Sequence, residues 1–169
     1  KLFDEELYDG KIALTKLEMD LNYPAMVYIG GNHESRIDRY VATYASKLGG
    51  MFSTRDILGI PKNFKWIPYG NSNIHRAGKL ICTHGSVCGV NPTLSMLRKY
   101  GASVSFGHTH LLQEGHITNV HGDTFGAFNI GWLGDVKHAG EYIQNVANWP
   151  HGCGLLWHKP GVEFFFTLF

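Results

Sequence analysis

The chain has 169 residues, of which 44% are hydrophobic and 17% are charged, and this composition indicates a globular protein and excludes a disordered one. The formal net charge of +1 shows none of the excess positive charge that is typical of nucleic-acid-binding proteins. Nucleic acid is therefore a possible partner that the charge does not indicate. No apolar run approaches the roughly 18 residues of a membrane span, so we expect no membrane partner.

Cysteine content favours a reducing compartment. The three cysteines, Cys82, Cys88 and Cys153, form no Cys-x-x-Cys pair, and their number is odd. This argues against a disulfide scaffold and a thiolate zinc site, and predicts a cytoplasmic protein. The sequence starts at Lys1 with no initiator Met, so we expect that its start was removed or that it continues upstream.

The first third of the chain alternates helix and strand. Apolar residues recur at helical spacing over 2–21, which predicts an amphipathic helix that ends at Tyr23-Pro24. Residues 25–29 then read as a buried strand closed by two glycines, and a second helix is expected over 35–48. The following residues, 51–72, look loop-rich.

The rest of the chain is richer in strands. A hairpin is predicted over 73–83, turning at Ala77-Gly78, and Asn91 should cap a helix that ends before Gly101. A strand should end at Phe106. Four further strands are expected at 111–120, 124–130, 153–158 and 162–168, with a short helix near 141–148. The pattern predicts one α/β domain over 1–169 with a β-rich second half.

Three short motifs follow three predicted strands. They are Gly31-Asn32-His33-Glu34, Thr83-His84-Gly85 and Gly107-His108-Thr109-His110. Ligands bind at the carboxyl edge of open α/β sheets, so the motifs should lie near one another. Residues i and i+2 of an extended segment point the same way, so His108 and His110 should face a common point.

Each motif alone also has an ordinary interpretation. Asn32 could cap a helix with Glu34 in its first turn, Thr-His-Gly could be a simple turn, and a His-x-His pair arises often by chance. The three together predict a metal site. Imidazole and amide ligands suit Mn, Fe, Ni or Zn and argue against Ca.

These motifs, in this order, resemble those of the calcineurin-like metallophosphoesterase superfamily, in the form found in bacteriophages and bacteria. The resemblance covers residues 30–110 and is specific for the superfamily but not for the substrate. It implies a four-layer αββα sandwich and a phosphoesterase that hydrolyses a phosphate mono- or diester. It also implies a dinuclear centre, for which Mn is favoured and Fe, Ni or Zn are alternatives.

The resemblance implies a role for each motif residue. Asn32, His84 and His108 would ligate one metal, and His110 would ligate the other. His33 would act as general acid or stabilise the transition state, and Glu34 would orient it. Arg36 could reach a phosphate oxygen, although a solvent-facing arginine fits the sequence equally well.

The sequence departs from the superfamily before Asn32. The Asp-x-His and Gly-Asp-x-x-Asp motifs that supply the bridging carboxylate do not occur there, and His33 is the first histidine. We therefore expect the domain to be incomplete at its N-terminus and this chain alone to bind one metal or none. Two close dications without an anion between them repel strongly. The alternative function is a non-catalytic metal-binding or protein-interaction scaffold of the same fold.

Two further expectations concern residues outside the motifs. Asp135 with His138, or His121 with Asp123, could replace the missing ligands, but aspartates beside glycine are more often turn residues. The tryptophans at 132, 149 and 157 should pack the second sheet rather than stack bases. The oligomeric state is not indicated.

Overall fold

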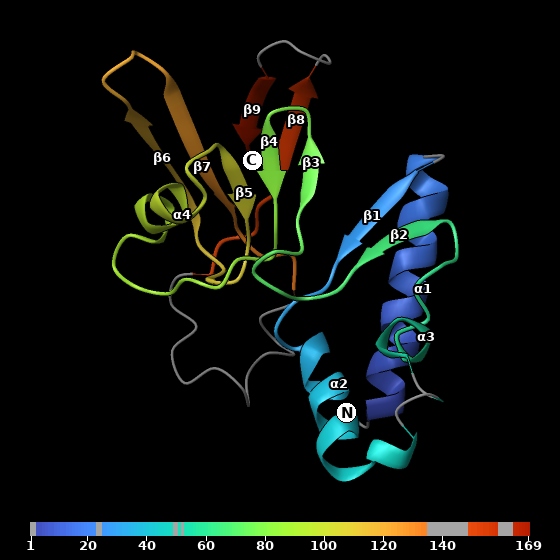
Figure 1. Cartoon of the computed structure of the whole chain (residues 1–169). Helices are drawn as coiled ribbons and strands as arrows, with labels where there is room; N and C mark the ends of the chain where they lie inside the picture. The colour runs from blue at the N-terminus through green and yellow to red at the C-terminus, as the bar shows by residue number, and fades with distance from the viewer. Residues whose placement is uncertain (1–2, 23–24, 49–50, 52, 135–148, 159–163) are drawn as a thin grey trace. The chain divides into compact units, whose positions relative to one another are not determined.

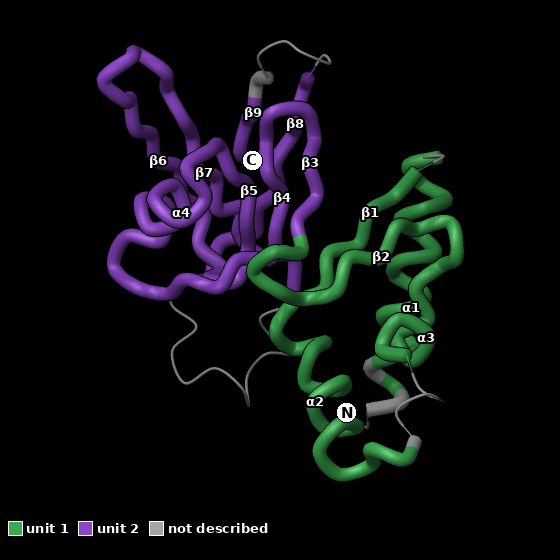
Figure 2. Tube along the Cα trace, in the orientation of Figure 1, with its two compact units in different colours: residues 1–73 green, residues 74–169 purple. Residues whose placement is uncertain are grey.

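The computed structural model describes residues 3–22, 25–48, 51, 53–134, 149–158 and 164–169. The chain has a mixed α/β structure (Figure 1). It divides into two compact units, Lys1–Asn73 and Ile74–Phe169, which Figure 2 distinguishes by colour. Among the described residues, no helix is both long enough and apolar enough to span a bilayer.

The first unit consists of helices around a two-stranded parallel sheet. In β1 and β2, Met26 lies opposite Phe64 and Ile29 opposite Ile67. Its buried apolar side chains include Ile60, Phe64 and Ile67. The elements are α1 (Phe3–Leu21), β1 (Met26–Ile29), α2 (Glu34–Tyr44), the 3-10 turn η1 (Ser46–Leu48), α3 (Thr54–Ile57) and β2 (Phe64–Ile67).

Three details of this unit differ from the sequence predictions. The second helix ends at Tyr44 because Ala45 leaves the helical region, with φ −136° and ψ 38°. Residues 51–72 are not only loop, since they contain α3 and β2. Strand β1 is only half-buried, and its Val27 is exposed.

The second unit is built on a five-stranded sheet in the order β3-β4-β5-β7-β6. Strands β4, β5 and β7 run parallel, whereas β3 and β6 are antiparallel to their neighbours. A separate antiparallel hairpin joins β8 and β9. The elements are β3 (His75–Ala77), β4 (Leu80–Cys82), α4 (Pro92–Tyr100), β5 (Val104–Phe106), β6 (Leu112–Thr118), β7 (Thr124–Ile130), β8 (Gly154–His158) and β9 (Phe164–Leu168).

Helix α4 covers one face of this sheet and closes the main core. It contacts β5, β6 and β7, and the predicted caps are confirmed: Asn91 accepts a hydrogen bond from the Leu94 N–H, and Gly101 is left-handed. The buried cluster is apolar and comes from this helix and three strands: Ile81, Met96, Leu97, Val104, Phe106 and Ala127. This core fixes the carboxyl ends of β4 and β5, where the two histidine motifs begin.

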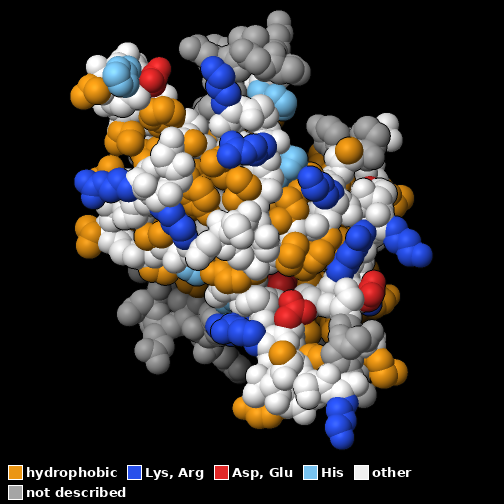
Figure 3. Space-filling model, viewed as in Figure 1, with side chains coloured by type: hydrophobic (Ala, Val, Ile, Leu, Met, Phe, Trp, Pro, Cys, Tyr) orange, Lys and Arg blue, Asp and Glu red, His pale blue; other side chains and the backbone are white. Residues whose placement is uncertain are grey.

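The predicted hairpin, the strand predicted to end at Phe106 and the four strands expected after it are confirmed to within about two residues. The helix predicted near 141–148 lies outside the described residues. On the face drawn in Figure 3, Lys and Arg side chains are scattered rather than gathered into one patch. That distribution agrees with the near-neutral net charge.

Candidate metal centre

Two of the predicted ligands, His84 and His108, come together at the end of the second sheet. Backbone pairing continues past β4 and β5, because Thr83 N–H donates to Ser105 O and Gly107 N–H donates to His84 O. This brings Nδ1 of His108 to 3.2 Å from Nε2 of His84. Nitrogens about 2.0–2.1 Å from one shared ion lie roughly 2.9–3.4 Å apart at octahedral or tetrahedral angles. The observed 3.2 Å is a hydrogen-bond distance between the two rings, and it also matches the spacing of two ligands of one metal.

The backbone at His108 is a tight turn rather than an extended strand. Strand β5 ends at Phe106, and Thr109 N–H donates to Gly107 O at 2.8 Å. With φ +68° at His108, this is the γ-turn with positive central φ, the rarer and more strained form. His110 also has positive φ, +58°. The expectation that an extended segment aims both histidines at one point is therefore wrong.

His110 lies among aromatic side chains. Its ring centroid is 6.0 Å from that of Trp132, nearly parallel to it, and 4.0 Å from that of Trp149, edge to face. The two indoles also contact each other. Trp132 and Trp149, predicted to pack the second sheet, thus contact the ring of a candidate ligand. For Trp157 on β8 the packing prediction is wrong, because its side chain is largely exposed.

Cys88 is a neighbour of the histidine pair that the sequence did not predict. Its Sγ lies 3.2 Å from Nε2 of His108, so His108 has one polar neighbour on each ring nitrogen. A neutral imidazole donates from one nitrogen and accepts at the other. Donation from Nε2 to the sulfur would leave the Nδ1 lone pair directed toward His84. No ligand-like spacing marks Cys88 in the sequence.

The Gly-Asn-His-Glu motif occupies the start of α2 in the first unit. His33, not Asn32, is the residue before the helix, and its side chain makes no capping bond. Both oxygens of Glu34 are engaged: Oε2 accepts from Gly31 N–H at 2.8 Å, and Oε1 accepts from the Tyr28 hydroxyl at 3.0 Å. Glu34 thus fixes the turn that carries Asn32 and His33.

The charges around this turn act on His33 and Tyr28. Loss of solvent around the His33 ring lowers its pKa, the Arg36 charge lowers it further, and Glu34 opposes both. Burial, together with Glu34, raises the pKa of Tyr28 well above its usual range, so Tyr28 stays a neutral donor. A neutral His33 is therefore favoured more strongly than in a free histidine.

The predicted residues fall in both units. His84 and His108 are paired in the second unit, and Asn32, His33, Glu34 and Arg36 are grouped in the first. Within the part of the chain that the structure describes, no set of three or more His, Cys, Asp or Glu side chains is arranged to hold a metal. The paired histidines supply only two ligands.

Of the two pairs proposed as substitutes for the missing ligands, the structure describes only His121 with Asp123. Asp123 sits in the β6–β7 turn, where its carboxylate accepts from Asn119 Nδ2 and its N–H donates to Asn119 Oδ1. This is the turn role that its glycine neighbour indicated. Asp135 and His138 lie outside the described residues.

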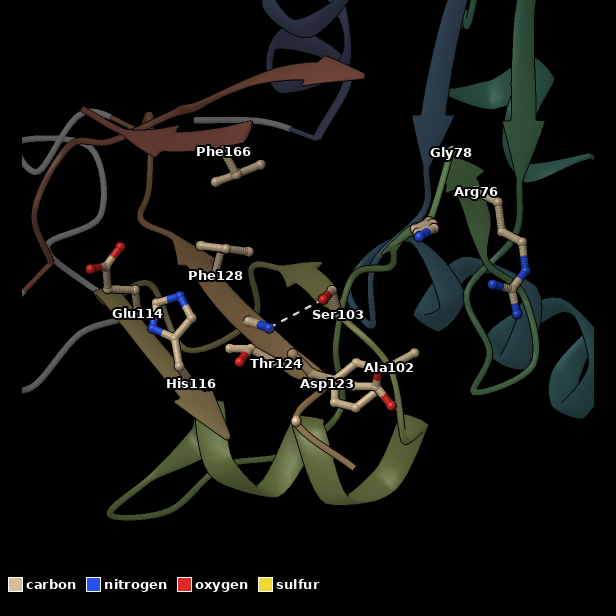
Figure 4. A pocket seen from close by; sticks show the side chains of 14 residues that line it. Arg76, Gly78, Ala102, Ser103, Glu114, His116, Asp123, Thr124, Phe128 and Phe166 are labelled. Carbon is tan, nitrogen blue, oxygen red and sulfur yellow. Dashed lines mark hydrogen bonds between the residues drawn. The ribbon is translucent and has the colours of Figure 1, made fainter. Parts of the chain in front are cut away.

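A cavity of about 1000 Å³ lies at the other end of the second unit's sheet. It is lined by the beginnings of β5 and β7, whereas the histidines follow the end of β5. Figure 4 shows Phe128 and Phe166 facing each other in it, with Glu114 and His116 projecting from β6. Its lining includes none of the motif residues.

Comparison of the chain with known protein families, with characterised proteins and with solved structures finds no match.

Proposed function

We propose that this chain carries part of the dinuclear metal centre of a phosphoesterase related to the calcineurin-like superfamily, with its four-layer αββα fold. The observation that carries the proposal is the His84–His108 pair, 3.2 Å apart, next to a strained turn. Strained non-glycine backbone is found preferentially at functional sites, where the surrounding structure holds it in place. The motif order in the sequence supports the same proposal.

The residues fit the roles that the resemblance implies. Asn32, His84 and His108 would hold one divalent ion through an amide oxygen and two imidazoles, and His110 would contribute to a second. Mn is favoured, with Fe, Ni or Zn as alternatives. Such a pair of ions supplies charge stabilisation and a nucleophilic hydroxide at neutral pH. His33 would hold or deliver a proton at the leaving oxygen, and Arg36 would bind a phosphate oxygen.

Glu34 would act on His33 through the backbone. Its carboxylate holds Gly31 N–H and the Tyr28 hydroxyl, so removing it would loosen the turn that carries His33. Glu34 therefore has a positioning role in this proposal.

The proposed centre is incomplete without carboxylates from outside these residues. Among the described residues, no Asp or Glu joins the histidines to form a group of three or more metal ligands. In the proposal, the bridging anion comes from another part of the protein or from a second chain. In this proposal the chain alone binds one ion, through His84 and His108, and does not bind the second.

The test is hydrolysis of bis-p-nitrophenyl phosphate and p-nitrophenyl phosphate with added Mn²⁺, using this chain and any longer product of the same reading frame. The ratio of the two rates assigns a diesterase or a monoesterase. His33→Ala should lower turnover by about 100-fold, as general acid catalysis is worth 10²–10⁴, while metal content holds. No hydrolysis in any form, or unchanged turnover in His33→Ala, would contradict the proposal.

The shortage of carboxylates favours one alternative, a metal-binding scaffold without catalysis. Such a protein would bind a metal through His84 and His108 but gain nothing from His33. Metal binding without hydrolysis in every form would therefore support the scaffold over the enzyme.

A further inference from the structure

Asn129 is a buried polar residue directly beside the histidine turn. It lies at the end of β7, where it is opposite Phe106 of β5 and Gln113 of β6. The exposed fraction of Asn129 is 0%, and the residues before it in the buried part of β7, Ala127 and Phe128, are apolar. A polar side chain buried at such a position requires a reason, because an apolar one would pack there without a desolvation cost.

The Asn129 side chain holds the middle residue of the turn. Its Nδ2 donates to Thr109 Oγ1 at 2.6 Å. Thr109 stands between the two left-handed histidines, and its own N–H closes the γ-turn onto Gly107. The Oδ1 atom of Asn129 is buried and has no hydrogen-bond partner among the residues that the structure describes. The amide thus gains only the bond to Thr109.

Two further contacts join the same end of β7 to the histidine motif. Gly131 N–H donates to Leu111 O at 3.0 Å, just after His110. The Trp132 ring lies nearly parallel to that of His110, at 6.0 Å between centroids. The segment 129–132 therefore contacts Thr109, His110 and Leu111.

We infer that Asn129 is a positioning residue that holds Thr109, and through it the strained turn, in the form that directs His108 toward His84. The inference rests on the proposed function, in which these histidines bind a metal. A turn with positive φ at two non-glycine residues relaxes unless its surroundings hold it. Without the Asn129 bond, the metal itself would have to draw the two imidazoles together, and its affinity would fall.

The experiment measures Co²⁺ affinity of the full 169-residue chain by titration of the Co²⁺ absorption bands. Asn129→Ala and Thr109→Val should each weaken binding by about 10-fold or more, as removing partners of metal-bound histidines does. The double variant should be no weaker than either single one, because both remove one bond. Thr109→Ser, which keeps the hydroxyl, should bind as the original chain does.

Asn119→Ala is the matched control. Asn119 lies in the same unit and makes side-chain bonds of its own, but it is in the β6–β7 turn, at the opposite end of β7. It should leave Co²⁺ affinity unchanged. Equal losses in Asn119→Ala and Asn129→Ala, or losses that add in the double variant, would mean general destabilisation and would overturn the inference.

A second readout requires no metal. Hydrogen exchange of the Thr109 amide, whose N–H closes the turn, should become about 10-fold faster in Asn129→Ala and Thr109→Val, with β5 amides unchanged. If the original chain binds no Co²⁺, the proposed function fails, yet this exchange still decides the role of Asn129. Unchanged Thr109 exchange in both variants overturns it. If Asn129→Ala does not fold, Thr109→Val and Thr109→Ser decide alone.

Discussion

The two units differ in how they bury apolar side chains. The second has a contiguous core in which Met96, Val104 and Ala127 are completely buried. In the first, α2 has no buried residue, no described side chain of α1 is buried, and Met19 is 74% exposed. The histidine pair therefore stands on a packed scaffold, whereas the Gly-Asn-His-Glu motif depends on local bonds from Glu34.

This difference bears on the proposed centre. Ligands held by a packed sheet can keep their spacing without a metal, and sites on rigid elements are positioned more accurately. The turn at Asn32 is held by local bonds: Glu34 accepts from Gly31 and Tyr28, and Ser35 donates to the carbonyls of Gly31 and Asn32. We expect the second unit to supply the preformed part of the site.

The largest effect is expected from Met96→Ala, compared with Met19→Ala. Met96 is completely buried, so its truncation should lower the free energy of unfolding by about 2–5 kcal/mol. Met19 is exposed, so the same change should cost less than about 0.5 kcal/mol. Urea unfolding followed by circular dichroism measures both. Equal costs would remove the distinction between the units.

A pair of glycines sharpens the comparison. Gly85 has φ +93°, and an added Cβ would lie 3.2 Å from the Phe106 ring, so Gly85→Ala should destabilise the fold by about 1–3 kcal/mol. Gly10 lies in α1 with nothing within 4 Å of an added Cβ, so Gly10→Ala should stabilise by about 0.5–1 kcal/mol. Thermal unfolding gives the two signs, and a stabilising Gly85→Ala would contradict the backbone described for the Thr-His-Gly segment.

A smaller effect concerns the protonation of His33. NMR titration of the metal-free chain should give a pKa below 6.5, and Arg36→Gln should raise it by removing a repelling charge. Because the folded pKa is lowered, the unfolded chain takes up the proton first as pH falls below 6.5. The contribution of His33 to the free energy of unfolding is thus complete above pH 6.5, and it is lost as the pH falls from 6.5 through the lower pKa of the folded chain. A pKa that falls in Arg36→Gln would contradict this.

The smallest effect is a difference in rate among the thiols. Burial raises the pKa of Cys82 to about 11, whereas Cys88 and Cys153 are exposed. At pH 8 iodoacetamide should modify Cys82 at least about 10-fold more slowly than the other two, because the thiolate is the nucleophile. Peptide mass spectrometry over time measures each rate. Equal rates would mean that the end of β4 is less buried than described.

Local rules predicted much of the second unit and less of the site. Asn91, Pro92 and Gly101 mark α4 because caps depend only on neighbouring residues. Strand β2 was missed because it is defined by its pairing with β1, far away in the sequence. The convergence of His84 and His108 followed from the strand order.

The surroundings of the histidines could not be predicted in the same way. The γ-turn at His108 is held by Thr109 and Asn129, and its shape depends on a contact between two strands. The proximity of Cys88 and the packing of Trp132 on His110 are likewise contacts across the fold. Residue type and spacing give no signal for them.

The most direct test of the central claim, that His84 and His108 form a metal-binding pair, is a count of bound ions. Equilibrium dialysis against Mn²⁺, followed by plasma mass spectrometry, should give one ion per chain. His84→Ala and His108→Ala should each abolish it, whereas His116→Ala, in the same sheet beside Phe128, should keep it. No ion at saturating Mn²⁺, or equal occupancy in all four proteins, would contradict the account.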